Sequence, residues 1–227
     1  MRFKDVFSII GPAMIGPSSS HTAGAARIGR AARQALGEPP LEADIALYGS
    51  FADTYRGHGT DKALVAGLLG HAPDDERLRD ALAHAELAGL QVSIRTGREL
   101  EPHPNTASIA LRGRASSVTV KGRSIGGGSI ELIAVDRFDV RFAAAQPTLL
   151  IFHEDRPGTV ARIAAILDRA QGNIVSMTVG RQSRQGAALT VMECDQAVPE
   201  EAVAEIGRVA GVSRVRTIDL SAEEADT

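Results

Sequence analysis

In the last third of the chain, the spacing of hydrophobic and polar residues alternates between the pattern of a strand and the pattern of a helix. Residues 149–152 form a short continuous apolar run, which is typical of a buried strand. Apolar side chains then recur at helical spacing through residues 160–167, and Gly172 supplies a helix stop. Residues 174–179 and 188–194 have the composition of two strands joined by a polar, glycine-containing hairpin turn.

A second helical stretch, residues 199–209, and a last strand, residues 212–220, complete this segment. The order strand, helix, strand, strand, helix, strand predicts a ferredoxin-like βαββαβ domain. The acidic residues 221–227 follow it, and we expect them to form a frayed tail.

The first part of the chain mixes both kinds of element. Helices are predicted at residues 23–36, 60–69 and 75–88, and strands at residues 45–48 and 92–94. From residue 108 onward, polar and apolar residues alternate as in antiparallel strands. The predicted fold class is therefore α+β, with an N-terminal mixed α/β domain before the ferredoxin-like one.

A small-residue stretch with one proline, residues 143–147, separates the two segments and precedes a new strand. We therefore expect an N-terminal domain at residues 1–143 and a C-terminal domain at residues 148–220. A chain of 227 residues is long enough for two ordinary domains.

Composition narrows the function classes. Hydrophobic residues make up 44% of the chain and charged residues 23%, as in soluble globular proteins. A net charge of -3 gives no reason to expect nucleic acid or an anionic membrane as a partner. The chain contains no apolar run of the roughly 18 residues that span a bilayer, and its start lacks the pattern of a signal peptide. We expect a cytoplasmic protein.

Cysteine and lysine usage restricts the cofactor chemistry. Cys194 is the only cysteine, so the chain can form neither an internal disulfide nor a cage of thiolates around a metal. None of its three lysines, Lys4, Lys62 and Lys121, lies in a sequence that resembles a pyridoxal phosphate site. We therefore expect neither a metal site within this chain nor pyridoxal phosphate.

The densest group of candidate functional residues precedes the first predicted helix. Two Gly-Pro pairs, residues 11–12 and 16–17, exclude a helix there. A run of hydroxyl and imidazole side chains follows: Ser18, Ser19, Ser20, His21 and Thr22. Unpaired N–H groups and the positive end of the helix dipole suit a carboxylate at this place. The alternative is a serine-rich capping loop, in which Thr22 is the candidate N-cap.

Three further motifs could contribute to the same site. His58 lies between two glycines before a predicted helix, so we expect an exposed imidazole that can transfer a proton; a surface histidine is the alternative. The loop His103, Pro104, Asn105 and Thr106 offers an imidazole, an amide and a hydroxyl, or is simply a turn. The glycines Gly126, Gly127 and Gly128 can bring backbone N–H groups close to a ligand, or form a flexible bend.

These motifs resemble those of one family. Residues 10–29, with the run Ile-Gly-Pro-Ser-Ser-Ser-His-Thr-Ala-Gly, are similar to the opening of the beta chain of iron-sulfur L-serine dehydratases. Residues 57–63, 103–106 and 124–128 also resemble that family, and residues 153–160 resemble the ligand loop of ACT domains. With the C-terminal segment, the resemblance covers essentially the whole chain.

The resemblance implies an L-serine ammonia-lyase, which converts L-serine to pyruvate and ammonia. The family's iron-sulfur cluster acts as a Lewis acid toward the serine hydroxyl. Because a [4Fe-4S] cluster normally needs several cysteines, the cluster is expected on a partner alpha subunit, and the isolated chain is expected to be inactive. His58 is the favoured base and His21 the competitor. The expected substrate-binding residues are Ser18, Ser19, Ser20, Thr22, His103, Asn105, Thr106 and the glycines 126–128.

The ACT-like segment implies regulation by an amino acid. His153, Asp155 and Asn173 match positions that contact the effector in serine-sensing ACT domains, although many of those have Asn where Asp155 stands. The alternative is that this domain only dimerises the protein. A rival interpretation of the whole chain is a non-catalytic amino-acid sensor, similar to the allosteric substrate-binding and ACT domains of some phosphoglycerate dehydrogenases.

Overall fold

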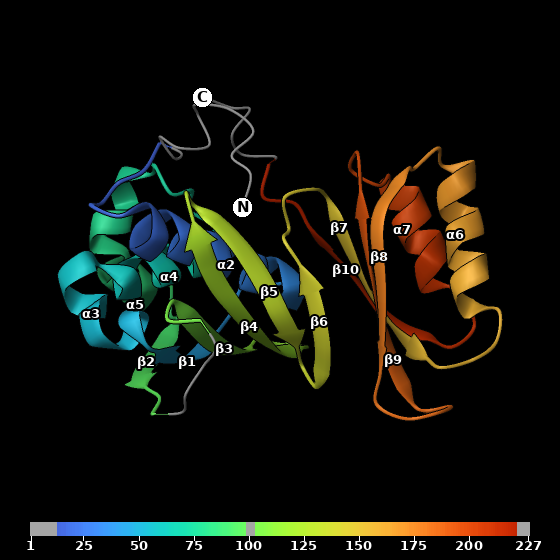
Figure 1. Cartoon of the computed structure of the whole chain (residues 1–227), viewed down its shortest axis with the longest axis horizontal. Helices are drawn as coiled ribbons and strands as arrows, with labels where there is room; N and C mark the ends of the chain where they lie inside the picture. The colour runs from blue at the N-terminus through green and yellow to red at the C-terminus, as the bar shows by residue number, and fades with distance from the viewer. Residues whose placement is uncertain (1–12, 99–102, 222–227) are drawn as a thin grey trace. The chain divides into compact units, whose positions relative to one another are not determined.

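The computed structural model describes residues 13–98 and 103–221, and Figure 1 shows its helices and strands. The chain divides between Ile133 and Ala134 into two compact units. This division lies earlier than the stretch at residues 143–147, because strand β6 (Phe138–Phe142) contacts β8 and β9 and so belongs to the second unit.

A six-stranded sheet has the order β2-β1-β3-β4-β5-β6, and its strands β1 to β4 with most of β5 lie in the first unit. Strand β1 pairs in parallel with β2, whereas β1 with β3 and β3 with β4 are antiparallel. The strands are β1 (Glu42–Tyr48), β2 (Gln91–Thr96), β3 (Thr106–Arg112), β4 (Ser117–Gly126), β5 (Ser129–Val135) and β6.

Helices pack on this sheet. They are a π-helical turn η1 (Ser19–Ala23), α2 (Gly24–Leu36), α3 (Ser50–His58), α4 (Thr60–Leu69), a 3-10 turn η2 (Glu76–Asp80) and α5 (Ala81–Leu87). Helix α2 contacts β3 and β4, and α4 packs on α2 (Figure 1). The mixed α/β prediction is confirmed, and so are the predicted helices at residues 23–36 and 60–69. The helix predicted at residues 75–88 is divided into η2 and α5.

Helices α2 and α4 approach each other closely through glycine. A methyl group built on Gly67 would lie 2.1 Å from the carbonyl oxygen of Ala26, and one on Gly29 would lie 2.2 Å from that of Leu64. Both obstacles are backbone atoms, which cannot rotate away. Glycine at these two positions therefore permits the contact that buries the α2 and α4 side chains.

The second unit confirms the βαββαβ order. Its elements are β7 (Thr148–Glu154), α6 (Thr159–Arg169), β8 (Ile174–Arg181), β9 (Ala187–Cys194), α7 (Glu200–Gly207) and β10 (Val212–Ile218), and the strand order is β10-β7-β9-β8. The two helices lie side by side over one face (Figure 1). Leu149, Ile163 and Met192 are among the buried core side chains between helices and sheet.

Cys194 is also part of this core and is completely buried. Burial, and next to it the charge of Asp195, raises the pKa of the thiol above its ordinary value. Strand β8, the edge strand next to β9, carries three exposed apolar side chains: Val175, Met177 and Val179.

Candidate active site

The serine-rich segment forms a π-helical turn that runs directly into α2. Its N-cap is Ser18, whose hydroxyl oxygen accepts a hydrogen bond from the backbone N–H of His21 at 3.1 Å. The expectation that Thr22 caps the helix was wrong, because the turn begins before it. Thr22 is buried, and its hydroxyl donates to the backbone carbonyl of His58 at 3.4 Å. Ser19 and Ser20 are half-buried within the turn.

The imidazole of His21 lies between two serine hydroxyls. Its Nε2 atom is 3.0 Å from Oγ of Ser50, and its Nδ1 atom is 3.4 Å from Oγ of Ser18. Burial lowers the pKa of His21 below 6.5, and the nearby His58 lowers it further; a backbone hydrogen bond at Ser50 acts in the opposite direction. The ring is therefore mainly neutral near pH 7.

His58 is the last residue of α3, and its ring centroid lies 4.9 Å from that of His21. Its Nδ1 atom is buried, and no group among the described residues hydrogen-bonds to it. The prediction of an exposed turn was wrong here, because Gly57 continues the helix and Gly59 ends it one residue after the histidine. The imidazole of His58 is half-buried and packs against that of His21.

The loop with His103 is ordered by its own hydrogen bonds. Nδ1 of His103 accepts from the backbone N–H of Asn105 at 3.2 Å, and the Thr106 hydroxyl donates to the His103 carbonyl at 2.7 Å. Burial lowers the pKa of His103, Arg123 lowers it further, and Glu131 opposes them. The buried Oδ1 atom of Asn105 has no hydrogen-bond donor within the described part of the chain, so it can accept one from a ligand.

This loop lies against the start of α3. The backbone N–H of Phe51 donates to the carbonyl of Pro104 at 3.3 Å. Gly49 has a φ of +54°, and a methyl group built on it would lie 2.7 Å from Cα of Pro104. A glycine before α3 therefore brings the loop beside Ser50, and through Ser50 toward His21.

The three glycines at residues 126–128 all have a positive φ; Gly126 is the last residue of strand β4, and Gly127 and Gly128 follow it. The carbonyl of Gly128 accepts a hydrogen bond from Arg27 of α2 at 3.3 Å. Ser124, also on β4, is fully buried against Gly24, the first residue of α2. A methyl group built on Gly24 would lie 2.1 Å from the hydroxyl oxygen of Ser124. The glycine turn is thus held to the start of α2, the helix that carries the serine-rich turn.

The predicted residues fall into three connected groups. His21, His58, Ser18 and Thr22 are in direct contact, while the His103 loop and the glycine turn join them through neighbouring elements. Sequence reasoning missed Ser50 and Arg27 as parts of this arrangement, and it named Ser124 only as the start of the motif at residues 124–128. A Gly-Ser pair directly after the predicted strand at residues 45–48 could have indicated Ser50; Arg27 carries no comparable local pattern.

The arrangement suits proton transfer on a small polar ligand. The His21 and His58 imidazoles lie in ring contact, and imidazole is the side chain that most often transfers protons near neutral pH. Serine hydroxyls, the amide oxygen of Asn105 and backbone N–H groups around them supply the donors and acceptors that an amino acid requires.

In the second unit, two of the predicted effector residues lie together. His153 is buried, with Nε2 2.8 Å from the Thr190 hydroxyl and Nδ1 2.7 Å from the carbonyl of Glu154. The Asp155 carboxylate accepts from the backbone N–H of Gln185 at 3.1 Å and from Arg181 at 3.0 Å. The Gln185 hydrogen bond, followed by that of Arg181, lowers the pKa of Asp155.

Asn173 lies elsewhere on the same sheet. It precedes β8, and its side-chain amide donates to Asp195 at 2.6 Å. His153 pairs with Ala188, which pairs with Arg181 at the far end of β8. Eight residues of strand at about 3.3 Å each separate Arg181 from Asn173 by roughly 25 Å. One chain therefore does not bring the three effector residues together.

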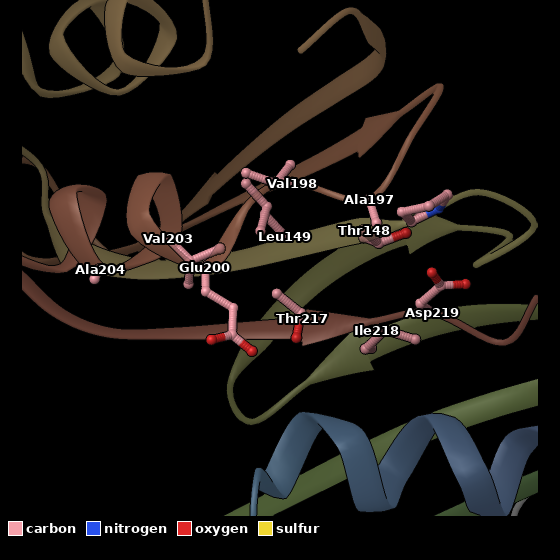
Figure 2. Close-up of a pocket in the computed structure, with 11 residues that line it drawn as sticks. Thr148, Leu149, Ala197, Val198, Glu200, Val203, Ala204, Thr217, Ile218 and Asp219 are labelled. Atoms are coloured by element: carbon pink, nitrogen blue, oxygen red, sulfur yellow. The ribbon is translucent and has the colours of Figure 1, made fainter. Parts of the chain in front are cut away.

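A pocket of about 330 Å³ lies between α7 and the edge strand β10 (Figure 2). Its walls include Leu149, Val198 and Val203, and its polar groups include Glu200 and Asp219. It is near the start of β7, whereas His153 lies near the end of that strand. The pocket is therefore separate from the His153 and Asp155 pair.

The described residues offer few side chains that could hold a metal. Within residues 13–98 and 103–221, no three His, Cys, Asp or Glu side chains form a group that could bind a metal ion. The sole thiol of the chain is a core side chain of the second unit. These residues do not fit an iron-sulfur cluster.

Among the helices of the described residues, none is long and apolar enough to span a membrane.

Comparison with known proteins gives matches over both units. The family described as "Serine dehydratase beta chain" matches residues 3–91, and the family "ACT domain" matches residues 147–211. The ACT match agrees with the observed βαββαβ order, which confirms the predicted C-terminal domain.

Two relatives align with nearly the whole chain, and a third aligns with most of it. A "Probable L-serine dehydratase, beta chain" of Bacillus subtilis is 41% identical over 218 residues, covering 96% of this chain and 99% of the relative. The "L-serine dehydratase, beta chain" of Peptoniphilus asaccharolyticus is 32% identical over 96% of this chain and 97% of its own. A D-3-phosphoglycerate dehydrogenase of Synechocystis is 26% identical over 78% of this chain, which spans 32% of that enzyme. With its two family matches and its near full-length likeness to two such subunits, this chain belongs to the family of L-serine dehydratase beta chains, with a C-terminal ACT domain.

Proposed function

We propose that this chain is the subunit without a cluster of an iron-sulfur L-serine dehydratase, which converts L-serine to pyruvate and ammonia. The observation that supports it best is the contact between the His21 and His58 imidazoles, which lie 4.9 Å apart between ring centroids. Both histidines fall in residues 3–91, the segment that matches the serine dehydratase beta chain family.

In this proposal, His58 removes the α-proton of serine. A base needs an acceptor nitrogen that no other group already engages in a hydrogen bond. The Nδ1 atom of His58 has no hydrogen-bond partner within the described residues. Both nitrogens of His21, in contrast, are next to serine hydroxyls, so His21 is the weaker candidate.

The substrate carboxylate would be bound by groups around this pair. The hydroxyls of Ser19 and Ser20 come from the turn before α2, and backbone N–H groups come from the glycines 126–128. Asn105 adds an amide whose buried Oδ1 atom can accept from the substrate ammonium. His103 and Thr106 would hold the loop that carries Asn105.

The cluster would belong to an alpha subunit. A [4Fe-4S] cluster is normally held by several cysteine thiolates, and this chain has one cysteine, buried in the core of the second unit. We therefore expect an active enzyme only when this chain is combined with its alpha subunit. A cytoplasmic location is part of the same proposal.

The ACT domain would bind L-serine as an effector between two copies of the chain. Its edge strand β8 exposes Val175, Met177 and Val179, side chains that a second copy could cover. A two-fold axis pairs such edge strands antiparallel, so the start of one strand lies beside the end of the other. Within one chain, Asn173 lies far from His153 and Asp155. In the dimer, Asn173 of the second copy would come close to these two residues.

Replacing His58 tests the catalytic proposal. In the enzyme reconstituted anaerobically with its alpha subunit, His58→Ala should lower kcat for pyruvate formation by about 100- to 10,000-fold, because the general base is lost. His84→Ala is the matched control, since His84 lies on α5 and contacts His71 instead. Assembly and iron content should be unchanged in both variants.

A near-normal kcat for His58→Ala would remove this histidine from the mechanism and leave His21 as the candidate base. If the wild-type complex carried its cluster, bound serine and formed no pyruvate, the amino-acid sensor would be the better interpretation. The likeness to a phosphoglycerate dehydrogenase, at 26% identity and across 32% of that enzyme, gives this second candidate less support.

A further inference from the structure

Ser50 is the partner of His21 that no motif indicated. It is the first residue of α3 and comes from a different segment than the serine-rich turn, 29 positions away along the chain. Its hydroxyl oxygen lies 3.0 Å from Nε2 of His21, which is the usual length of a hydrogen bond. Among the described residues, this is the only hydrogen bond of the Ser50 hydroxyl.

The other side of the His21 ring is fixed by Ser18. The Ser18 hydroxyl oxygen already accepts the backbone N–H of His21 at 3.1 Å, so its own proton is available for Nδ1 at 3.4 Å. A neutral imidazole has one donor nitrogen and one acceptor nitrogen. If Nδ1 accepts from Ser18, Nε2 carries the proton and donates it to Ser50.

The ring is also packed on its faces. The Phe51 ring meets it edge-on at 5.2 Å, and the His58 ring lies at 4.9 Å with a tilt of 44°. Ser50 and Phe51 begin the same helix that His58 ends. One helix therefore supplies the hydrogen bond at Nε2, the edge contact and the second imidazole.

We propose that Ser50 is a positioning residue, which holds the His21 imidazole in the Nε2–H tautomer and in place beside His58. This inference rests on the proposed function, because it matters for turnover only if the histidine pair acts on serine. Without the Ser50 hydroxyl, Nε2 of His21 loses its only side-chain partner among the described residues, so the ring and its tautomer are held less firmly. The reacting atoms would then be misplaced without loss of the groups that bind serine.

The experiment compares Ser50→Ala, Ser50→Thr and the control Thr54→Ala. Thr54 lies one turn further along α3, and its hydroxyl donates to the carbonyl of Ser50 at 2.7 Å, so the control removes a hydroxyl from the same helix. We expect Ser50→Ala to lower kcat of the reconstituted enzyme about tenfold to a hundredfold, with little change in KM. Ser50→Thr keeps a hydroxyl and should restore most of kcat.

The isolated full chain gives an independent measurement. Long-range proton–nitrogen correlation spectra should show His21 with a protonated Nε2 in the wild type and in Thr54→Ala, and averaged nitrogen shifts in Ser50→Ala. Equal kcat in Ser50→Ala and Thr54→Ala, or a His21 tautomer that does not respond to Ser50→Ala, overturns the inference. Failure of the wild-type complex to form pyruvate would instead contradict the proposed function, while the spectra still decide the Ser50 to His21 bond.

Discussion

Replacing Gly67 by alanine tests the close contact of α2 with α4. In a helix, alanine is favoured over glycine by about 1 kcal/mol, so an exposed position would gain stability. At Gly67 the new methyl carbon would lie 2.1 Å from the carbonyl oxygen of Ala26 and 2.9 Å from Cα of Gly29. These are backbone atoms, so the helices must move apart.

The magnitude follows from these two effects. Forcing extra atoms into a packed core typically costs 1–3 kcal/mol, and a contact this short with backbone on the other side corresponds to about 3 kcal/mol. After subtraction of the helix preference, Gly67→Ala should lose about 2 kcal/mol. For a protein of this size, that lowers Tm by roughly 4–8 °C.

Gly57→Ala provides the matched control. Gly57 lies inside α3, and a methyl group there would meet no atom within 4 Å. Only the helix preference remains, so its Tm should be equal to or higher than that of the wild type. Thermal unfolding of the three chains, followed by circular dichroism, measures the difference. If Gly67→Ala unfolds at the same temperature as Gly57→Ala, the two helices are not in the contact described.

Two further predictions concern pH and the ACT domain. Burial is the largest cause that lowers the pKa of His21, His71 and His103 below 6.5, so the folded chain binds fewer protons than the unfolded chain. The stability present above pH 6.5 should therefore decline as pH falls from 7.5 to 5.5; a Tm that stays constant or rises in buffered melts would contradict this. Asp155→Asn should shift the serine activation curve of the complex at constant maximal rate, since it removes a charge beside the proposed effector. Coupling between sites is typically about 1–3 kcal/mol, which is visible in a titration, and superimposable curves would favour a purely dimerising domain.

The sequence predicted those elements whose periodicity was strong. The βαββαβ order of the second unit and helix α2 followed from the spacing of apolar residues, because one face of each element is buried. Helix α3 was not predicted, since it starts after Gly49 and contains Gly57, a residue that weakens helices. Its formation depends on tertiary contacts, such as that between Phe51 and Pro104.

The candidate site was predictable as a set of motifs and not as an arrangement. His21 and His58 were both identified, but their ring contact depends on how η1 packs against α3. Ser50 belongs to no polar cluster in the sequence and becomes a partner of His21 only through that packing. The position of Asn173, far from His153, likewise follows from strand register, which local patterns do not determine.

The buried thiol of Cys194 has a practical consequence for handling the protein. Oxidants react with the thiolate, and this thiol is both inaccessible and held in its protonated form by burial. We therefore expect the purified chain to tolerate air without forming disulfide-linked aggregates. Each of the two subunits can be prepared either in air or under nitrogen, and the preparations can then be mixed in all combinations. If activity is lost whenever the alpha subunit was exposed to air, and only then, the oxygen-sensitive group of the enzyme lies outside this chain.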